Sequence, residues 1–223
     1  MQDLVTLLDN ADVLGKFTVA QKQRLISTTI RHVLEQDKSL YWQGDHWTNV
    51  LLIASGKLRS VIHSLDGRSY VVSTWEEGGE FWPHTLFDGE SMPSTLEAAQ
   101  ESVIYRWDGE DVLRILFENS EAVRALLRRQ IKLIRKRRET IADLAFQPVT
   151  GRLAKLLLER VPVSEISAHR DLTLDQIASM VASSPEVVCR TLYQLQRDGL
   201  LHVTRASITL HDRAALERLV GAG

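Results

Sequence analysis

The sequence predicts an α+β protein in which an N-terminal antiparallel β-barrel of the jelly-roll type precedes a long helix and a C-terminal winged helix–turn–helix. Three observations lead to this expectation. Turn signals recur between short apolar runs up to about position 107, a seven-residue apolar repeat follows, and the last third has the pattern of helix, tight turn, helix and hairpin. We therefore expect three segments, residues 1–118, 119–146 and 147–223.

The composition restricts the class of protein. With 223 residues the chain is long enough to bury one large core or two modest ones. Its single cysteine excludes an internal disulfide and any all-cysteine iron–sulfur cluster or zinc site within one chain. No apolar run is long enough to cross a bilayer and the N-terminus is acidic, so we expect a cytoplasmic protein without a signal peptide.

Charge is distributed unevenly along the chain. Residues 1–118 carry 18 Asp and Glu against 10 Lys and Arg, whereas residues 119–223 carry 11 against 17. All five Trp lie in the acidic part. This asymmetry favours two modules with different partners and predicts a polyanionic partner for the basic one.

The barrel is predicted from the spacing of turn signals between Leu40 and Trp107. The run VLLIASGKLRSVIHSLDGRSYVVSTW is interrupted at Ser55-Gly56 and at Asp66-Gly67, and the second dipeptide is a strong hairpin signal. Many short strands at this spacing indicate a small antiparallel barrel or sandwich. Further turn signals stand at Gly44-Asp45, Gly78-Gly79 and Asp88-Gly89.

The long helix is predicted to run unbroken from a cap at Asn119-Ser120 to Pro148, which ends it. Its apolar repeat places Leu127, Ile134 and Ile141 seven residues apart. Two sets of partners satisfy the alternating spacing of a two-stranded coiled coil, either Val123, Gln130, Arg137 and Leu144 or Ile131, Arg138 and Ala145.

This narrow apolar stripe on a basic helix favours pairing with a second copy of the chain. The alternative is an amphipathic helix packed only on its own barrel. We expect a homodimer, with the contact residues Val123, Leu127, Gln130, Ile134, Ile141 and Leu144.

The last segment has the order of a winged helix–turn–helix. GRLAKLLLERV and LTLDQIASMVA are amphipathic, and Thr173 and Gln176 have the spacing of a capping box. SSPEVVCRTLYQLQRDGLL opens with a cap signal and ends at Gly199, and HVTRASITLH alternates like a two-stranded wing. We expect the turn MVASS to form without a left-handed residue, since a positive φ at Ala182 would cost about 1 kcal/mol.

Taken together, these motifs resemble the CRP/FNR family of bacterial transcription regulators over nearly the whole chain. YWQGD, VLLIASGKLRSVI, SLDGR and GGEF resemble the cyclic-nucleotide-binding barrel of that family. LAFQPVTGRLAKLLL resembles its hinge and the first helix of its DNA-binding domain, and LTLDQIASMVASSPEVVCRTLYQLQRDGLL resembles its helix–turn–helix. The resemblance implies a sensor barrel, a dimerisation helix, double-stranded DNA as a partner and RNA polymerase as a second partner.

The resemblance places SSPEVVCR in the major groove, with Glu186 and Arg190 contacting base edges. A carboxylate accepts a hydrogen bond from cytosine N4 and a guanidinium donates two to guanine, and a spacing of four places both residues on one helix face. The alternative is that Glu186 only closes a capping box with Ser183 while Arg190 is a solvated surface charge. Pro185 stands where part of the family has Arg, so the base that this Arg selects is not predicted.

We expect this module to bind a palindromic operator. Thr173, Arg152 and the wing residue Arg205 are candidate phosphate contacts, which position a protein on DNA without specifying sequence. Cys189 is expected to be a small DNA-facing residue and not a redox switch. The expected DNA-binding residues are Thr173, Ser184, Pro185, Glu186, Cys189, Arg190 and Arg205.

The run GEFWPHTLFDGESMPSTLEA contains no Lys or Arg. In relatives that bind cyclic nucleotides, a Gly-Glu turn holds the ribose and a following Arg pairs with the cyclic phosphate. Gly79 and Glu80 match the turn, but Met92 and Pro93 stand at the Arg-Ser positions. A partly buried phosphate needs a charge-assisted partner, so we do not expect an ordinary cyclic nucleotide here.

Three alternatives remain for this region: another small effector, aromatic or carboxylated; haem, with His84 or another His as axial ligand; or a cavity filled by the protein's own Trp and Phe side chains. Arg137 or Arg138 could supply a cation from the long helix, or both could point into water. The candidate pocket residues are Gly79, Glu80, Phe81, Trp82, His84, Met92, Ser94, Arg137 and Arg138.

An enzyme is the contrasting class of protein. The sequence contains no phosphate-binding Walker loop, no Gly-x-Ser-x-Gly elbow, no His-Glu-x-x-His and no metal-ligand cluster, so we expect no catalytic and no metal-binding residues. A regulatory ligand-binding module that does not bind DNA would leave the helix–turn–helix motif unexplained.

Overall fold

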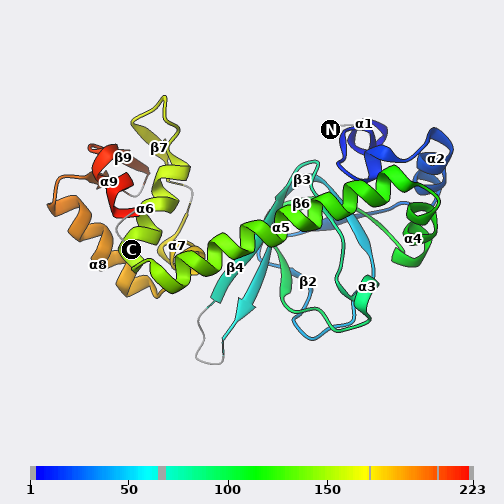
Figure 1. Cartoon of the computed structure of the whole chain (residues 1–223), viewed down its shortest axis with the longest axis horizontal. Coiled ribbons are helices and arrows are strands. Elements are labelled where there is room, and N and C mark those ends of the chain that lie inside the picture. Colours follow the sequence, from blue (N-terminus) through cyan, green and yellow to red (C-terminus); the bar gives the residue numbers. More distant parts are fainter. Residues whose placement is uncertain (1–3, 65–68, 171, 205, 221–223) are drawn as a thin grey trace. The chain divides into compact units, whose positions relative to one another are not determined.

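The computed structural model describes residues 4–64, 69–170, 172–204 and 206–220. The chain divides into two compact units, residues 1–62 with 71–134 and residues 63–70 with 135–223. The division falls inside the long helix α5 (Ser120–Phe146), which is continuous over its whole length (Figure 1). The three-segment boundaries expected from the sequence therefore remain a prediction.

The first unit is built on an antiparallel sheet. In the described residues its strands are ordered β1-β6-β3-β4, with β2 also paired to β6 and β5 to β3. The central strand β6 pairs antiparallel with both β1 and β3, and the register places Ile53 opposite Ile104. The strands are β1 (Ile30–Leu34), β2 (Ser39–Tyr41), β3 (Val50–His63), β4 (Ser69–Glu76), β5 (Glu80–Phe81) and β6 (Thr95–Trp107).

This antiparallel sheet, followed by a long helix and a helix–turn–helix, confirms the predicted fold class. The pairings within the described residues do not return from β4 to β1, so they form an open sheet and not a closed barrel. The expected hairpin turn at Asp66-Gly67 lies outside the described residues.

The expected turn at Ser55-Gly56 is wrong, because both residues lie inside the continuous strand β3. The ladder between β3 and β6 shifts register here, which is the signature of a β-bulge. Gly56 has φ +86°, and a Cβ at this position would lie 2.2 Å from the carbonyl oxygen of Glu101. The glycine therefore permits a close approach of two strands. A Ser-Gly pair needed for this purpose has the same sequence pattern as a turn.

Helices cover one end of the sheet and share its core. Trp107, at the end of β6, is almost fully buried, and its indole N–H donates to the carbonyl oxygen of Leu25 at 2.8 Å. The first turns of α5 add Ala122, Ala125 and Leu126 to the same core. The helices of this unit, besides α5, are α1 (Leu4–Asn10), η1 (Leu14–Lys16), α2 (Val19–Ser27), α3 (Thr85–Asp88) and α4 (Gly109–Phe117).

The second unit contains four helices and a small antiparallel sheet in the described residues (Figure 1). The predicted two-stranded wing is present, and a third strand that the sequence did not indicate, β7, pairs with β9 in the order β7-β9-β8. The elements are α6 (Val149–Arg160), β7 (Ser167–His169), α7 (Leu174–Met180), α8 (Pro185–Arg197), β8 (Leu201–Val203), β9 (Ser207–Leu210) and α9 (Arg213–Val220).

The turn between α7 and α8 differs from the expectation. Ala182 has φ +50°, so the turn does contain a left-handed residue, and the sequence-based prediction was wrong. Arg152 on α6 donates to the carbonyl oxygens of Val181 at 2.9 Å, Ala182 at 3.4 Å and Gln147 at 2.7 Å. These hydrogen bonds hold the strained turn from outside, so a glycine is not needed.

Among the described residues, no helix combines the length and the apolar content that crossing a bilayer requires.

Candidate functional site

The helix α8 has one buried and one exposed face. Val188, Leu192 and Leu195 are buried in the core of the second unit. This leaves the opposite face in solvent, with Glu186, Arg190 and Tyr193 exposed at spacings of four and three. These spacings align side chains along one side of a helix. The structure therefore brings the two predicted base-reading residues together on an outward face.

The start of α8 is fixed by Ser184 and not by Ser183. The Ser184 hydroxyl accepts a hydrogen bond from the backbone N–H of Val187, and Pro185 occupies the first turn, where no backbone donor is needed. The alternative capping box between Ser183 and Glu186 is therefore incorrect. The pKa of the Glu186 carboxyl is held below its usual value by a hydrogen bond from the side chain of Ser184 and by one from the backbone N–H of Glu186 itself. Glu186 is thus a carboxylate, a hydrogen-bond acceptor, at neutral pH.

Arg190 forms no salt bridge with any carboxylate of the described chain. An exposed guanidinium that no carboxylate neutralises is free to donate to an acceptor from outside the protein. One helix face therefore presents both an acceptor and a donor, which is the combination needed to read a G·C or C·G pair.

Two other predicted DNA contacts, Thr173 and Cys189, lie in the described part of the second unit. Thr173 caps α7 as expected: its hydroxyl accepts from the N–H of Gln176, whose side chain accepts from the N–H of Thr173. Cys189 is half-buried beside a small cavity. The guanidinium of Arg152, a candidate phosphate contact, instead donates to backbone carbonyl oxygens of its own chain in the turn described above. Arg205 lies outside the described residues.

The predicted pocket residue Glu80 is fully buried at 0 % exposure and lies in a dense hydrogen-bond network. Its Oε1 accepts from the backbone N–H groups of Val13 at 2.8 Å and Leu14 at 3.1 Å. Its Oε2 accepts from the indole N–H of Trp82 at 2.8 Å. Glu80 stands where relatives that bind cyclic nucleotides have the ribose-binding carboxylate. In this chain its oxygens already accept hydrogen bonds from the protein itself.

The cation beside Glu80 is Arg129 of α5, which the sequence analysis did not single out. Its Nη1 lies 3.7 Å from Glu80 Oε2, and its Nη2 donates to the backbone oxygen of the same residue. Arg129 follows Ala122, Ala125 and Leu126 on the buried side of α5. The spacing of Arg129 from the buried residues of α5 is the one sequence signal that would have indicated a buried carboxylate partner.

The remaining pocket candidates of the first unit lie in several different environments. Phe81 and Met92 pack in a different core cluster from Trp82, and Ser94 shares a buried 2.6 Å hydrogen bond with Ser60. Gly79 is half-buried in the tight turn before β5 and His84 is exposed next to α3. Arg137 and Arg138 are exposed and belong to the second compact unit. In the described residues no group of three or more His, Cys, Asp or Glu has an arrangement that could hold a metal ion.

The exposed face of α5 distinguishes the two heptad sets. Leu127, Ile131, Ile134 and Ile141 are 57 %, 52 %, 54 % and 64 % exposed. Val123, in contrast, packs against the core of the first unit and Gln130 is half-buried. Within the expected dimer contacts, Val123 is therefore better explained as a core residue of its own chain. The exposed stripe is the second set, Leu127, Ile131, Ile134, Arg138, Ile141 and Ala145, with Leu144 beside it.

A sheet domain followed by a helix–turn–helix with an outward acceptor–donor face defines the class of DNA-binding transcription regulators. Comparison with known families agrees. Residues 31–119 match the cyclic nucleotide-binding domain and residues 151–219 match the Crp-like helix-turn-helix domain. The chain belongs to the CRP/FNR family of transcription regulators, a family of non-enzymes.

Known relatives extend over most of the chain. The cAMP-activated global transcriptional regulator Vfr of Pseudomonas aeruginosa is 25 % identical over 81 % of this chain and 88 % of its own length. A Crp/Fnr-family regulator from Eubacterium rectale has a similar fold, with a TM-score of 0.78, 20 % identity and coverage of 96 % and 99 % of the two chains. The c-di-GMP-responsive regulator CLP of Xanthomonas campestris superposes with a TM-score of 0.75 at 20 % identity, over 86 % and 99 %.

The network around Glu80 gives a test of stability. Replacing Arg129 with Ala removes the cation beside a fully buried carboxylate, so we expect a loss on the order of 3 kcal/mol in the free energy of unfolding. Arg128→Ala, the matched control on the exposed side of the same turn, should change it by less than about 0.5 kcal/mol. Urea unfolding monitored by circular dichroism measures both. Equal stability of the two variants would contradict a stabilising role for Arg129.

Proposed function

We propose that this protein is a homodimeric, sequence-specific regulator that reads a palindromic operator with α8 and whose sensor domain takes no ordinary cyclic nucleotide. The observation that carries the DNA-reading part is the outward face of α8. It combines a Glu186 carboxylate of lowered pKa with an Arg190 guanidinium that no carboxylate of the described chain neutralises. In this proposal Glu186 and Arg190 specify bases, Thr173 and Arg205 contact phosphates, and Ser184, Pro185 and Cys189 are further DNA-facing residues.

The stripe on α5 supports a dimer. Its members alternate at spacings of four and three, and the isoleucines and the leucine in it are more than half exposed in the single chain. A second copy of the same helix has the matching periodicity to cover them, whereas the chain's own core is already closed by Ala122, Ala125 and Leu126. Two reading helices in a dimer require half-sites about one helical turn, roughly 34 Å, apart.

The sensor proposal rests on the absence of Lys and Arg from residues 79–98 and on the occupation of Glu80. The family's ribose-binding carboxylate already accepts three hydrogen bonds from its own chain and lies beside Arg129. This arrangement favours a sensor domain whose cavity is filled by its own side chains. The curated relative Vfr is cAMP-activated, but the chemistry that would hold a cyclic phosphate is not found between residues 79 and 98 of this chain.

One observation favours a second candidate, a different small effector. The Tyr41 hydroxyl is buried and has no hydrogen-bond partner among the described residues. A buried donor without a partner costs about 1–3 kcal/mol, and a polar effector or a bound water would remove this cost. The ring of Tyr41 stacks on Trp47 at 5.5 Å and lies 5.9 Å from Phe81, so such an effector would meet an aromatic wall. CLP shows that a protein of this fold responds to a ligand other than cAMP.

Two further expectations follow from the proposed function. A regulator that acts on chromosomal DNA works in the cytoplasm, and regulation of transcription makes RNA polymerase its second protein partner. Haem is the other effector class considered, but His84 is exposed beside α3 and separate from the buried core.

The reading residues can be tested with single substitutions. Glu186→Ala or Arg190→Ala should each reduce affinity for the preferred operator by about 1–3 kcal/mol and relax one base position in each half-site. Affinity for random duplex DNA should change far less. Selection of binding sites from a random library, followed by titration of single-base variants, measures this. If both variants retain the parent's base preferences, the assignment of the two readers is wrong.

The dimer proposal predicts that Ile134→Glu gives a monomer that binds a single half-site weakly, because a charge then enters the apolar stripe on both chains. Arg128→Glu is a control on the same helix, outside the stripe. Analytical ultracentrifugation gives the oligomeric state, and titration of full and half operators gives the effect on DNA binding. A parent protein that sediments as a monomer at micromolar concentration would contradict the proposal.

The sensor proposal predicts no response to cyclic nucleotides. Saturating cAMP or c-di-GMP should leave the melting temperature unchanged, because neither is expected to bind. A ligand that did bind, at 100 times its dissociation constant, would stabilise the folded state by about 2.7 kcal/mol and raise the melting temperature measurably. Vfr, a cAMP-activated relative, is the positive control for cAMP. An absorption spectrum of the purified protein tests for haem through its Soret band. A clear thermal shift with cAMP would overturn the proposal.

A further inference from the structure

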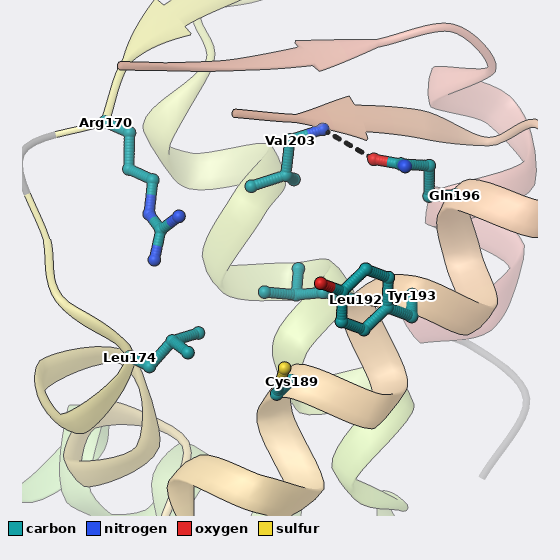
Figure 2. A pocket seen from close by; sticks show the side chains of 7 residues that line it. All are labelled: Arg170, Leu174, Cys189, Leu192, Tyr193, Gln196 and Val203. Carbon is teal, nitrogen blue, oxygen red and sulfur yellow. Dashed lines mark hydrogen bonds between the residues drawn. The ribbon is translucent and has the colours of Figure 1, made fainter. Parts of the chain in front are cut away.

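A small cavity lies beside the reading helix, within the second unit. Its walls come from α7, α8, β8 and the side chain of Arg170, and its volume is about 120 Å³. Figure 2 shows Arg170 and Tyr193 on opposite sides of this space, with aliphatic side chains between them. The lining residues are Arg170, Leu174, Cys189, Leu192, Tyr193, Gln196 and Val203.

Two backbone carbonyl groups hold Arg170 in place. Its Nε donates to the carbonyl oxygen of Leu172 at 3.1 Å, and its Nη1 donates to that of Thr204 at 3.0 Å. Neither partner carries a charge, and no salt bridge of Arg170 occurs in the described part of the chain. A guanidinium fixed by two carbonyl groups keeps its charge and spare donors for an external anion, and its orientation is set in advance.

Tyr193 forms the opposite wall and is 64 % exposed. It lies seven residues after Glu186 and three after Arg190, on the same outward face of α8. Its hydroxyl has no hydrogen-bond partner among the described residues, so it is available as a donor. The cavity is therefore continuous with the face that reads bases, and it was not anticipated from the sequence.

The size of the cavity limits its occupant. Sites for small effectors usually enclose about 300–1,000 Å³, so a nucleotide or a similar molecule is too large. A single deoxyribose with its phosphate presents a compact, largely apolar ring next to one anion. The aliphatic floor formed by Leu174, Leu192 and Val203 matches the ring, and the fixed cation at its edge matches the phosphate.

We propose that the cavity between α7, α8 and β8 binds one sugar-phosphate unit of the operator strand, with Arg170 as the phosphate contact and Tyr193 packed against the sugar. This inference rests on the proposed DNA-reading function and adds a positioning site to it. Because every nucleotide carries the same sugar and phosphate, the contact contributes affinity and orientation but no base preference.

The test uses the full chain and a preferred operator. Arg170→Met removes the charge and retains an aliphatic stem, and it should lower affinity on the order of tenfold for every operator sequence. The slope of log affinity against log salt should fall by about one for each half-site, because one phosphate contact is lost. Arg170→Lys should retain the slope. Arg218→Met, which removes an exposed charge from α9, is the matched control and should bind as the parent does.

An operator with single methylphosphonate substitutions locates the contact. One uncharged phosphate per half-site should weaken binding of the parent protein but have no further effect on Arg170→Met. Tyr193→Ala should weaken binding of all sequences, whereas Tyr193→Phe should retain most of the affinity because the ring remains. Circular dichroism confirms that each variant is folded.

The outcomes separate this inference from the function on which it rests. If the parent protein selects no operator, the DNA-reading function fails. If it selects one and Glu186→Ala relaxes base preference while Arg170→Met binds as the parent does, only the sugar-phosphate site is wrong. If benzoate, a small aromatic acid, raises the melting temperature of the parent but not of Arg170→Met and leaves DNA binding unchanged, the cavity is an effector site and the inference is overturned.

Discussion

The buried carboxylate of Glu80 is the interaction on which much of the first unit depends. An ionised group at 0 % exposure is costly unless its oxygens are fully hydrogen-bonded and a cation lies nearby. Meeting that demand brings together the N–H groups at the start of η1, the indole of Trp82 and the guanidinium of Arg129. One side chain thereby joins the N-terminal helical segment, β5 and α5, which are far apart in sequence.

The position of α5 has a direct geometric consequence. A helix rotates by about 100° per residue, so the face that meets the core and the face that meets solvent are fixed together. With Ala122, Leu126 and Arg129 directed inward, Leu127, Ile131 and Ile134 are directed outward. The same buried charge that organises the sheet domain therefore also determines which apolar stripe of α5 is exposed to solvent.

Much of the second unit could be predicted from sequence because its signals are local. The capping box of Thr173 and Gln176 and the four-residue spacing that puts Glu186 and Arg190 on one side of a helix depend on neighbouring residues only. The features that the sequence did not predict depend on residues that are distant along the chain. Gly56 is needed because the backbone of Glu101 lies too close to it for a side chain. In the same way, Arg129 pairs with the carboxylate of Glu80, which lies on a strand far away in sequence. A pattern of residue types does not encode which distant group will be adjacent, so such features become visible only in three dimensions.

The left-handed Ala182 limits how far the DNA-reading motif can be reduced. Its conformation is unfavourable for a residue with a side chain, and the groups that hold it are the donors of Arg152 on α6. The same arginine also donates a hydrogen bond to the carbonyl oxygen of Gln147, the residue directly after α5. The helix pair α7–α8 is therefore not a self-sufficient module. Any fragment or graft that is to keep α8 in its native orientation to α7 must begin before α6.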